Sequence, residues 1–150
     1  MNSKLLVLIG AVATIAGLFL PIADTINPAD GSAMSLNLLL PGGSIGDGIV
    51  TLGLAVVAAV LALLNQTRHA VWPALLGLGY LVWRYLDIKA ATDQATSLVA
   101  MLPPEQAQNY HIGINYLGWG VIVAGTILTL IGGAMAWKGN AAASAPPPAA

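Results

Sequence analysis

Long apolar segments separated by short polar ones dominate this chain. The apolar segments lie at about residues 5–23, 47–64, 70–88 and 112–137, and few charged side chains interrupt them. A helix needs ~20 apolar residues to cross the ~30 Å hydrocarbon core of a bilayer, and each segment is close to that length. The pattern therefore predicts an all-α membrane protein with four transmembrane helices, in which residues 1–139 form one domain.

Two connections in the first half of the chain have distinct characters. Residues 24–46 contain the pairs Asn27-Pro28 and Asp30-Gly31, which favour turns, so we expect a long outer loop there. Residues 65–69 are too few for anything but a tight turn. Such a turn predicts that the second and third helices are antiparallel neighbours.

The remaining connections lie in the second half. Residues 90–111 are expected to form an outer loop in which the third helix is first prolonged, until Pro103 ends it. Residues 140–150 are rich in Ala and Pro and have no means of packing, so we expect a disordered tail.

The first apolar segment also has features of a signal peptide, because Lys4 precedes it. Cleavage would then be expected near Ala23, but Pro21 and Asp24 make a poor small-residue cleavage site. We therefore expect this segment to be retained as the first transmembrane helix.

Composition supports a membrane environment. Hydrophobic residues make up 57% of the chain and charged residues 7%, whereas soluble domains carry about 25% charged residues. A soluble helical protein is thus a poor alternative. The net charge of −1 gives no indication of nucleic-acid binding. The absence of cysteine excludes disulfides, thiolate metal ligands and cysteine nucleophiles.

The few charges are distributed unevenly between the two predicted sides. Lys4, Arg68 and Lys138 fall on one side, and Arg84 and Lys89 on the other. The second side also receives every acidic residue: Asp24, Asp30, Asp47, Asp87, Asp93 and Glu105. By the positive-inside rule, we expect a multi-pass membrane protein with both termini in the cytoplasm.

Small residues recur at a spacing of seven along the predicted helices. The residues expected to pack helices together are Gly10, Gly17, Ala55, Ala62, Gly77, Gly118, Gly125 and Gly132. A period of seven keeps a residue on one seam of a left-handed supercoil, and small residues let helix backbones approach closely in lipid. The pattern predicts a left-handed, antiparallel four-helix bundle with crossing angles of about 20°.

Polar residues follow these seams at the outer side and form the candidate site. The expected outer polar cluster consists of Asp24, Asp47, Arg84, Asp87 and His111. Arg84 lies within the third apolar segment, with Asp87 as its local partner at i+3 and Asp47 as its interhelical one. The competing interpretation is that Arg84 only reaches the headgroups beside aromatic residues.

The chemistry of these residues does not indicate a reaction. Asp24, Asp47, Asp87 and His111 have oxygen and nitrogen atoms suited to metals, but no ligand spacing groups them. Neither histidine has a serine partner nearby that would suggest nucleophilic catalysis. We accordingly assign no catalytic, cofactor-binding or metal-binding residues, and we expect no cofactor.

Four features resemble small bacterial four-span integral membrane proteins of unassigned function. They are Leu20-Pro21 at the end of the first span, Gly46-Asp47-Gly48 at the start of the second, Tyr85-Leu86-Asp87-Ile88 in the third and the Gly-rich residues 118–133 in the fourth. The resemblance implies the topology and no activity. A claudin-like protein is excluded, because the first loop lacks the Trp and Cys signature.

These observations favour a non-catalytic structural or accessory subunit that packs against a larger membrane assembly. Its expected partners are the lipid bilayer and either another membrane protein or further copies of itself. The alternative is a small oligomeric transporter or channel that uses the outer polar cluster around Arg84. A third possibility, a membrane enzyme at the outer face, would need Asp47, Asp87 or His111 as acid–base groups.

Overall fold

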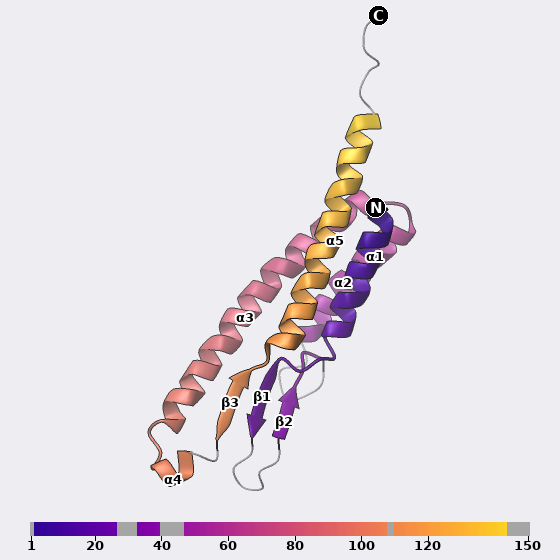
Figure 1. Cartoon of the computed structure of the whole chain (residues 1–150). Helices are drawn as coiled ribbons and strands as arrows, with labels where there is room; N and C mark the ends of the chain where they lie inside the picture. Colours follow the sequence, from indigo (N-terminus) through magenta and orange to yellow (C-terminus); the bar gives the residue numbers. More distant parts are fainter. Residues whose placement is uncertain (1, 27–32, 40–46, 108–109, 144–150) are drawn as a thin grey trace, which may run out of the picture.

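The computed structural model describes residues 2–26, 33–39, 47–107 and 110–143. These residues are predominantly helical, which confirms the prediction of a mostly α-helical chain. The long helices, side by side in Figure 1, are α1 (Ser3–Gly17), α2 (Asp47–Leu63), α3 (Val71–Val99) and α5 (Tyr116–Ala143). A 3-10 turn, η1 (Thr67–Ala70), precedes α3, and the one-turn helix α4 (Pro104–Ala107) follows it.

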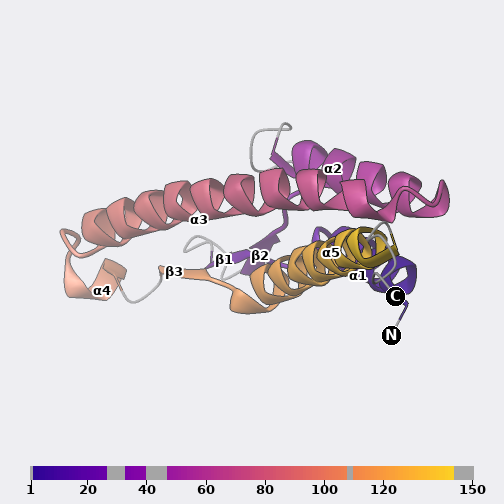
Figure 2. The same cartoon turned by 90° about the horizontal axis from the view of Figure 1, so that it is seen from above.

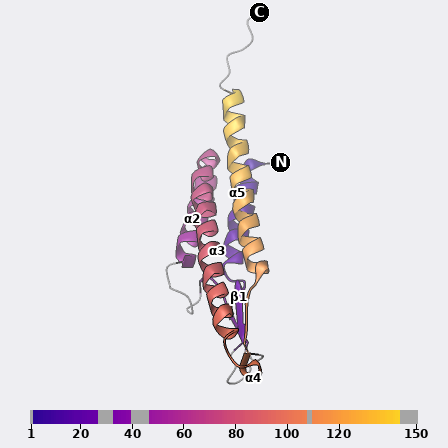
Figure 3. The same ribbon diagram turned by 90° about the vertical axis from the view of Figure 1, so that its left-hand side faces the viewer.

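The long helices form two layers. Figure 2 shows α2 and α3 in one layer and α1 with α5 in the other. The contact between α1 and α5 is the most extensive in the described structure. The N-terminus, the turn between α2 and α3 and the C-terminal end of α5 all lie at the same end of the molecule (Figures 1 and 3).

Glycines allow α1 and α5 to approach backbone to backbone. A Cβ atom added to Gly10 would lie 2.5 Å from the carbonyl oxygen of Gly125, and one added to Gly125 would lie 2.5 Å from the backbone nitrogen of Thr14. Added to Gly132, it would lie 2.8 Å from the carbonyl oxygen of Ser3. Each distance is below the 3.0 Å that real Cβ atoms respect, so any larger residue would push the helices apart.

The same holds at the other end of this pair. A Cβ atom on Gly17 would lie 2.6 Å from the Ile122 side chain, and one on Gly118 would collide with the carbonyl group of Pro21. Gly77 on α3 differs, because its nearest neighbours, Leu54 and Thr126, would be at ordinary contact distances of 3.8 and 3.9 Å. Among the glycines expected to pack helices, the tight contacts are therefore those between α1 with its continuation and α5. Gly133 of α5, outside the predicted set, is equally close to Val71 at the start of α3.

The small residues of α2 belong to a core cluster that is distinct from the glycine contacts between α1 and α5. Ala58 and Ala62 pack with Val7 of α1 and Ala70 of η1, and all of them are buried. Ala55, one turn from Ala58, is also buried. Alanine thus occupies much of the buried face of α2, where its small side chain lets neighbouring helices approach closely.

The turn between α2 and α3 is held by a left-handed residue and a lysine. Asn65 has φ of 60°, a conformation in which Asn commonly ends a helix. The Lys4 ammonium group donates a hydrogen bond to Asn65 Oδ1 at 3.0 Å. This bond connects the start of α1 to the turn, at the end of the molecule where the chain termini also lie.

A three-stranded sheet replaces part of the loops expected over residues 24–46 and 90–111. Strands β1 (Ala23–Ile26), β2 (Ala33–Leu36) and β3 (His111–Ile114) are antiparallel, in the order β2-β1-β3. Asp24 lies opposite Ser35 on β2 and opposite Gly113 on β3. Each strand has only four residues, too few for an alternating pattern to stand out in the sequence.

The helix ends also differ from expectation in places. The prolongation of the third helix was expected, and α3 continues to Val99, alongside the sheet in Figure 1. Helix α5 reaches Ala143, so its last turn occupies part of the segment expected to be a disordered tail. Residues 144–150 of that tail, and residues 27–32 and 40–46 of the first loop, lie outside the described residues.

Among the described residues, one helical segment is long and apolar enough to cross a membrane, Tyr116–Gly139 of α5. Helices α1 and α2 are apolar but have only 15 and 17 residues. Helix α3 has 29 residues and includes Arg84, Asp87, Lys89 and Asp93. Helix length and composition therefore do not by themselves support four membrane spans.

A matched pair of substitutions on α5 tests the glycine contact. Gly125→Ala should lower the free energy of unfolding by about 1–3 kcal/mol, because its methyl group would overlap the α1 backbone. Gly120→Ala should cause no loss, because nothing lies within 4 Å of the added Cβ atom. Unfolding of purified protein in mixed detergent micelles, followed by circular dichroism, measures both. Equal effects at the two positions would contradict the close contact.

Candidate functional site

The described residues of the predicted polar cluster do not share one site, and Asp24 is fixed at the start of α5 by Asn115. The Asn115 side-chain amide donates to Asp24 Oδ2 at 2.8 Å. The backbone nitrogen of Asn115 donates to the carbonyl oxygen of Ile22 at 2.9 Å, and its Oδ1 accepts from the backbone nitrogen of Leu117 at 3.1 Å. Asn115 thus caps the start of α5 and joins β1 to it.

Arg84 and Asp87 form the ion pair that their i+3 spacing predicts. The Arg84 guanidinium donates to Asp87 Oδ2 within α3. The Arg84 side chain is only 17% exposed, whereas that of Asp87 is 55% exposed. In this ion pair, the Arg84 side chain is therefore mostly buried, and that of Asp87 lies at the surface of the molecule.

A second ion pair follows on the same helix. The Lys89 ammonium group donates to Asp93 Oδ2 at 2.7 Å. This hydrogen bond, together with the negative charge of Asp93, raises the pKa of Lys89 above its ordinary value. Both side chains are exposed, so the pair contributes solubility to the outer part of α3 more than stability.

The other two residues of the predicted cluster are placed differently. Asp47 is the first residue of α2, and its side chain lies outside the described part of the structure. His111 is exposed on β3, opposite Ile26. It lines a hollow of about 190 Å³ with Tyr110 and Thr96. Asp24 and Arg84 thus have described partners of their own, Asn115 and Asp87, and His111 faces a separate hollow.

The described residues include no cluster of side chains that could bind a metal ion. Within residues 2–26, 33–39, 47–107 and 110–143, no group of three or more His, Cys, Asp or Glu side chains could hold an ion. Asp87 and Asp93 instead pair with cations on their own helix. At this polar end, the described side-chain contacts thus include two ion pairs within α3 and one link between β1 and the start of α5.

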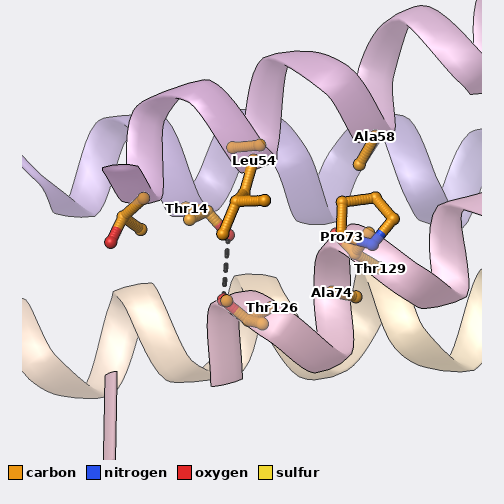
Figure 4. A pocket seen from close by; sticks show the side chains of 10 residues that line it. Thr14, Leu54, Ala58, Pro73, Ala74, Thr126 and Thr129 are labelled. Carbon is orange, nitrogen blue, oxygen red and sulfur yellow. Dashed lines mark hydrogen bonds between the residues drawn. The ribbon is translucent and has the colours of Figure 1, made fainter. Parts of the chain in front are cut away.

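A second polar group, absent from the residues predicted from the sequence, lies between the helices. Thr14, Thr51, Thr126 and Thr129 are all buried, and they line a cavity of about 20 Å³. Figure 4 shows this cavity, with Pro73 and Ala74 of α3 on its wall. The sequence holds one signal for it, since a threonine follows Gly10 and Gly125 at i+4, on the same helix face.

Three of these threonines bond to their own helix. Thr14 Oγ1 donates to the carbonyl oxygen of Gly10 at 2.9 Å, and Thr129 Oγ1 donates to that of Gly125 at 3.0 Å. Thr126 Oγ1 donates to the carbonyl oxygen of Ile122 at 2.9 Å. The Thr14 and Thr126 hydroxyl oxygens lie 3.5 Å apart, across the interface between α1 and α5 (Figure 4).

An apolar groove of about 470 Å³ separates α3 from α5 near the sheet. Its lining residues are Leu78, Leu81, Val82, Tyr85, Tyr116, Trp119, Gly120 and Val123. Tyr85 and Trp119 contact each other edge to face, with ring centroids 5.5 Å apart. The groove has an apolar wall of the kind that lipid chains or an apolar helix contact.

Replacement of Asn115 tests the link between β1 and α5. Asn115→Ala should lower the free energy of unfolding by about 1–2 kcal/mol, because both the cap of α5 and the bond to Asp24 are lost. Asn115→Ser should lose less, because a serine side chain still caps a helix but does not reach Asp24. Equal stability of the wild type and both variants, measured in detergent micelles, would show that these bonds do not hold the junction.

Comparison with known proteins does not assign the chain to a family. No protein-family model, no curated protein and no solved structure matches it.

Proposed function

We propose that this protein is a small, non-catalytic integral membrane protein, a structural or accessory subunit that packs against a larger membrane assembly. The observation that carries the proposal is a distribution of side chains opposite to that of soluble proteins. Many small and hydroxyl-bearing residues are buried between the helices, beside one cluster of large apolar side chains (Leu18, Ile22, Leu81, Trp119 and Ile122), while many more large apolar residues cover the outside.

The interior of the helical part is made largely of Ala, Gly and Thr. Its buried residues include Thr14, Thr51, Ala55, Ala58, Ala62, Ala74, Gly77, Gly125, Thr126, Thr129 and Gly132. The hydrophobic effect gives such an interior little stability in water, because it buries little apolar area. In lipid, by contrast, close packing of small residues and interhelical hydrogen bonds are the main source of association.

The outside shows the opposite composition. Exposed large apolar residues include Leu5, Ile9 and Val12 on α1; Ile49, Val50, Val56, Val57, Val60 and Leu63 on α2; Trp72, Leu75, Leu76, Val82, Trp83 and Leu86 on α3; and Leu117, Ile127, Ile131 and Met135 on α5. A soluble monomer rarely exposes apolar patches of this extent. Lipid tails solvate them at no cost.

Four spans are compatible with the helix lengths only if the bilayer adapts. Helix α1 rises ~22 Å and α2 ~25 Å at 1.5 Å per residue, both short of the ~30 Å core. Local thinning of the bilayer and the apolar residues that continue α1 to Leu20 reduce this mismatch. Arg84 can place its charge at the outer headgroups, where its partner Asp87 is already exposed.

The same proposal orients the protein in the bacterial inner membrane. The sheet, which includes Asp24, lies at one end of the helices, and the termini lie at the other (Figure 1). Lys4 and Arg68 accompany the termini, so the positive-inside rule favours cytoplasmic termini. The left-handed crossing of about 20° expected from the seven-residue spacing belongs to this proposal.

Exposed glycines support a protein partner or a second copy of the chain. Gly53 on α2, Gly79 on α3 and Gly120 on α5 are exposed, and an added Cβ atom would meet nothing within 4 Å. A glycine within a helix costs about 1 kcal/mol relative to alanine, and no contact with the described residues offsets this cost. A neighbouring helix that approaches closely at these positions would offset it.

The transporter alternative has less support. The cavity among the helices has a volume of about 20 Å³, which leaves no room for a solute pathway through one copy. A transporter would therefore have to form its pathway between copies. Liposome flux that is abolished by Arg84→Ala and by Asp47→Ala would favour this alternative over an accessory subunit.

Association can be tested with variants at the exposed glycines. Purification from native membranes in mild detergent, followed by native mass spectrometry, should show a stoichiometric complex. Gly53→Leu and Gly79→Leu should weaken that complex, because a bulky side chain blocks close helix approach, while helicity stays unchanged. The matched control is Val57→Leu, which adds bulk where a large side chain is already exposed. Isolation of a lone monomer for the wild type would contradict the proposal.

A further inference from the structure

The small cavity lies at the seam between the two helix layers. Its lining residues come from α1 (Thr14), α2 (Thr51, Leu54, Ala55, Ala58), α3 (Pro73, Ala74, Gly77) and α5 (Thr126, Thr129). The α1–α5 contact is fixed by the glycine backbone approach, but the contacts between that layer and α2 are much less extensive. A group that bridges the cavity would connect α2 to the tighter pair.

Thr51 has an unmet requirement for a hydrogen bond. Its side chain is 1% exposed, and its Oγ1 has no hydrogen-bond partner within the described parts of the protein. The other three threonines that line the cavity all donate to a carbonyl oxygen one turn back. Buried hydroxyl groups in proteins are almost always satisfied, by protein atoms or by ordered water.

We propose that this cavity binds a single water molecule, which bridges Thr51 on α2 to Thr14 and Thr126 on the α1–α5 pair. The volume of about 20 Å³ exceeds the ~10–15 Å³ that one water needs. Three hydroxyl groups supply the two to four polar partners that buried waters typically have. The site follows from the packing of the described helices, whether or not they span a membrane.

The hydrogen-bond directions are consistent with this assignment. The Thr14 and Thr126 hydroxyl protons are both directed at carbonyl oxygens, so their 3.5 Å contact has no proton of its own to share. Both oxygens keep free lone pairs. Water can donate its two protons to these oxygens and accept the hydroxyl proton of Thr51, which satisfies all three groups.

Water fits this site better than a cation does. The lining residues include no carboxylate, so an ion here would have no opposite charge to compensate its loss of hydration. An apolar occupant would leave the Thr51 hydroxyl group unsatisfied. The site therefore suits a small neutral molecule that both donates and accepts hydrogen bonds, which is what water is.

The sign of a stability change separates a bridged Thr51 from an unsatisfied one. If water bridges it, Thr51→Val should raise the unfolding equilibrium constant about three- to tenfold, because a net hydrogen bond is lost while the shape is kept. If the hydroxyl group is unsatisfied, the same variant should lower that constant. Two control variants accompany this test. Thr51→Ser keeps the hydroxyl group at position 51, and Thr129→Val removes a lining hydroxyl group that takes no part in the bridge.

Direct detection of the water completes the test. In wild-type protein in lipid nanodiscs, nuclear Overhauser cross-peaks should join water to the methyl groups of Thr14 and Thr126. They should persist in Thr51→Ser and Thr129→Val and disappear in Thr51→Val. Cross-peaks that are missing in the wild type, or that survive Thr51→Val, would overturn the proposal, as would a Thr51→Val protein at least as stable as the wild type.

Discussion

The backbone contact between α1 and α5 is the constraint on which the rest of this structure depends. Gly10 and Gly125 face each other with no room for a Cβ atom on either side. This approach brings Thr14 and Thr126 within 3.5 Å of each other and forms one wall of the small cavity. If the two helices moved apart by the width of a methyl group, the threonine contact would be lost and the cavity would change its size and shape.

The same pair positions the polar end of the molecule. Helix α1 leads through Pro21 into β1, and β3 leads into α5, so two neighbouring strands of the sheet continue two neighbouring helices. Gly118 allows the Pro21 carbonyl group to lie against the start of α5. The bonds of Asn115 to Ile22 and Asp24 then fasten β1 at that point. The sheet is thus held in place by the helix contact beneath it.

Helix positions and their small-residue seams could be predicted from this sequence, because both depend on periodicity over many residues. The sheet could not be predicted, because its strands are four residues long and lie beside turn-forming pairs. The polar cluster was predicted by extending helical seams, such as that from Gly17 to Asp24. The chain leaves the helix at Leu18 and becomes a strand at Ala23, so a helical seam does not continue to Asp24. The threonine cavity could not be predicted either, because it depends on distances between helices, and the sequence pattern of one helix does not determine those distances.

The central claim is that lipid surrounds the large apolar residues outside this tightly packed interior. Spin labels at Val57→Cys and Ile127→Cys test it directly, because the natural chain has no cysteine. In nanodiscs, collision rates with oxygen should exceed those with a water-soluble nickel chelate at both positions. The order should reverse at Gln94→Cys, on the polar outer part of α3. Greater access of the nickel chelate at positions 57 and 127 would contradict the account.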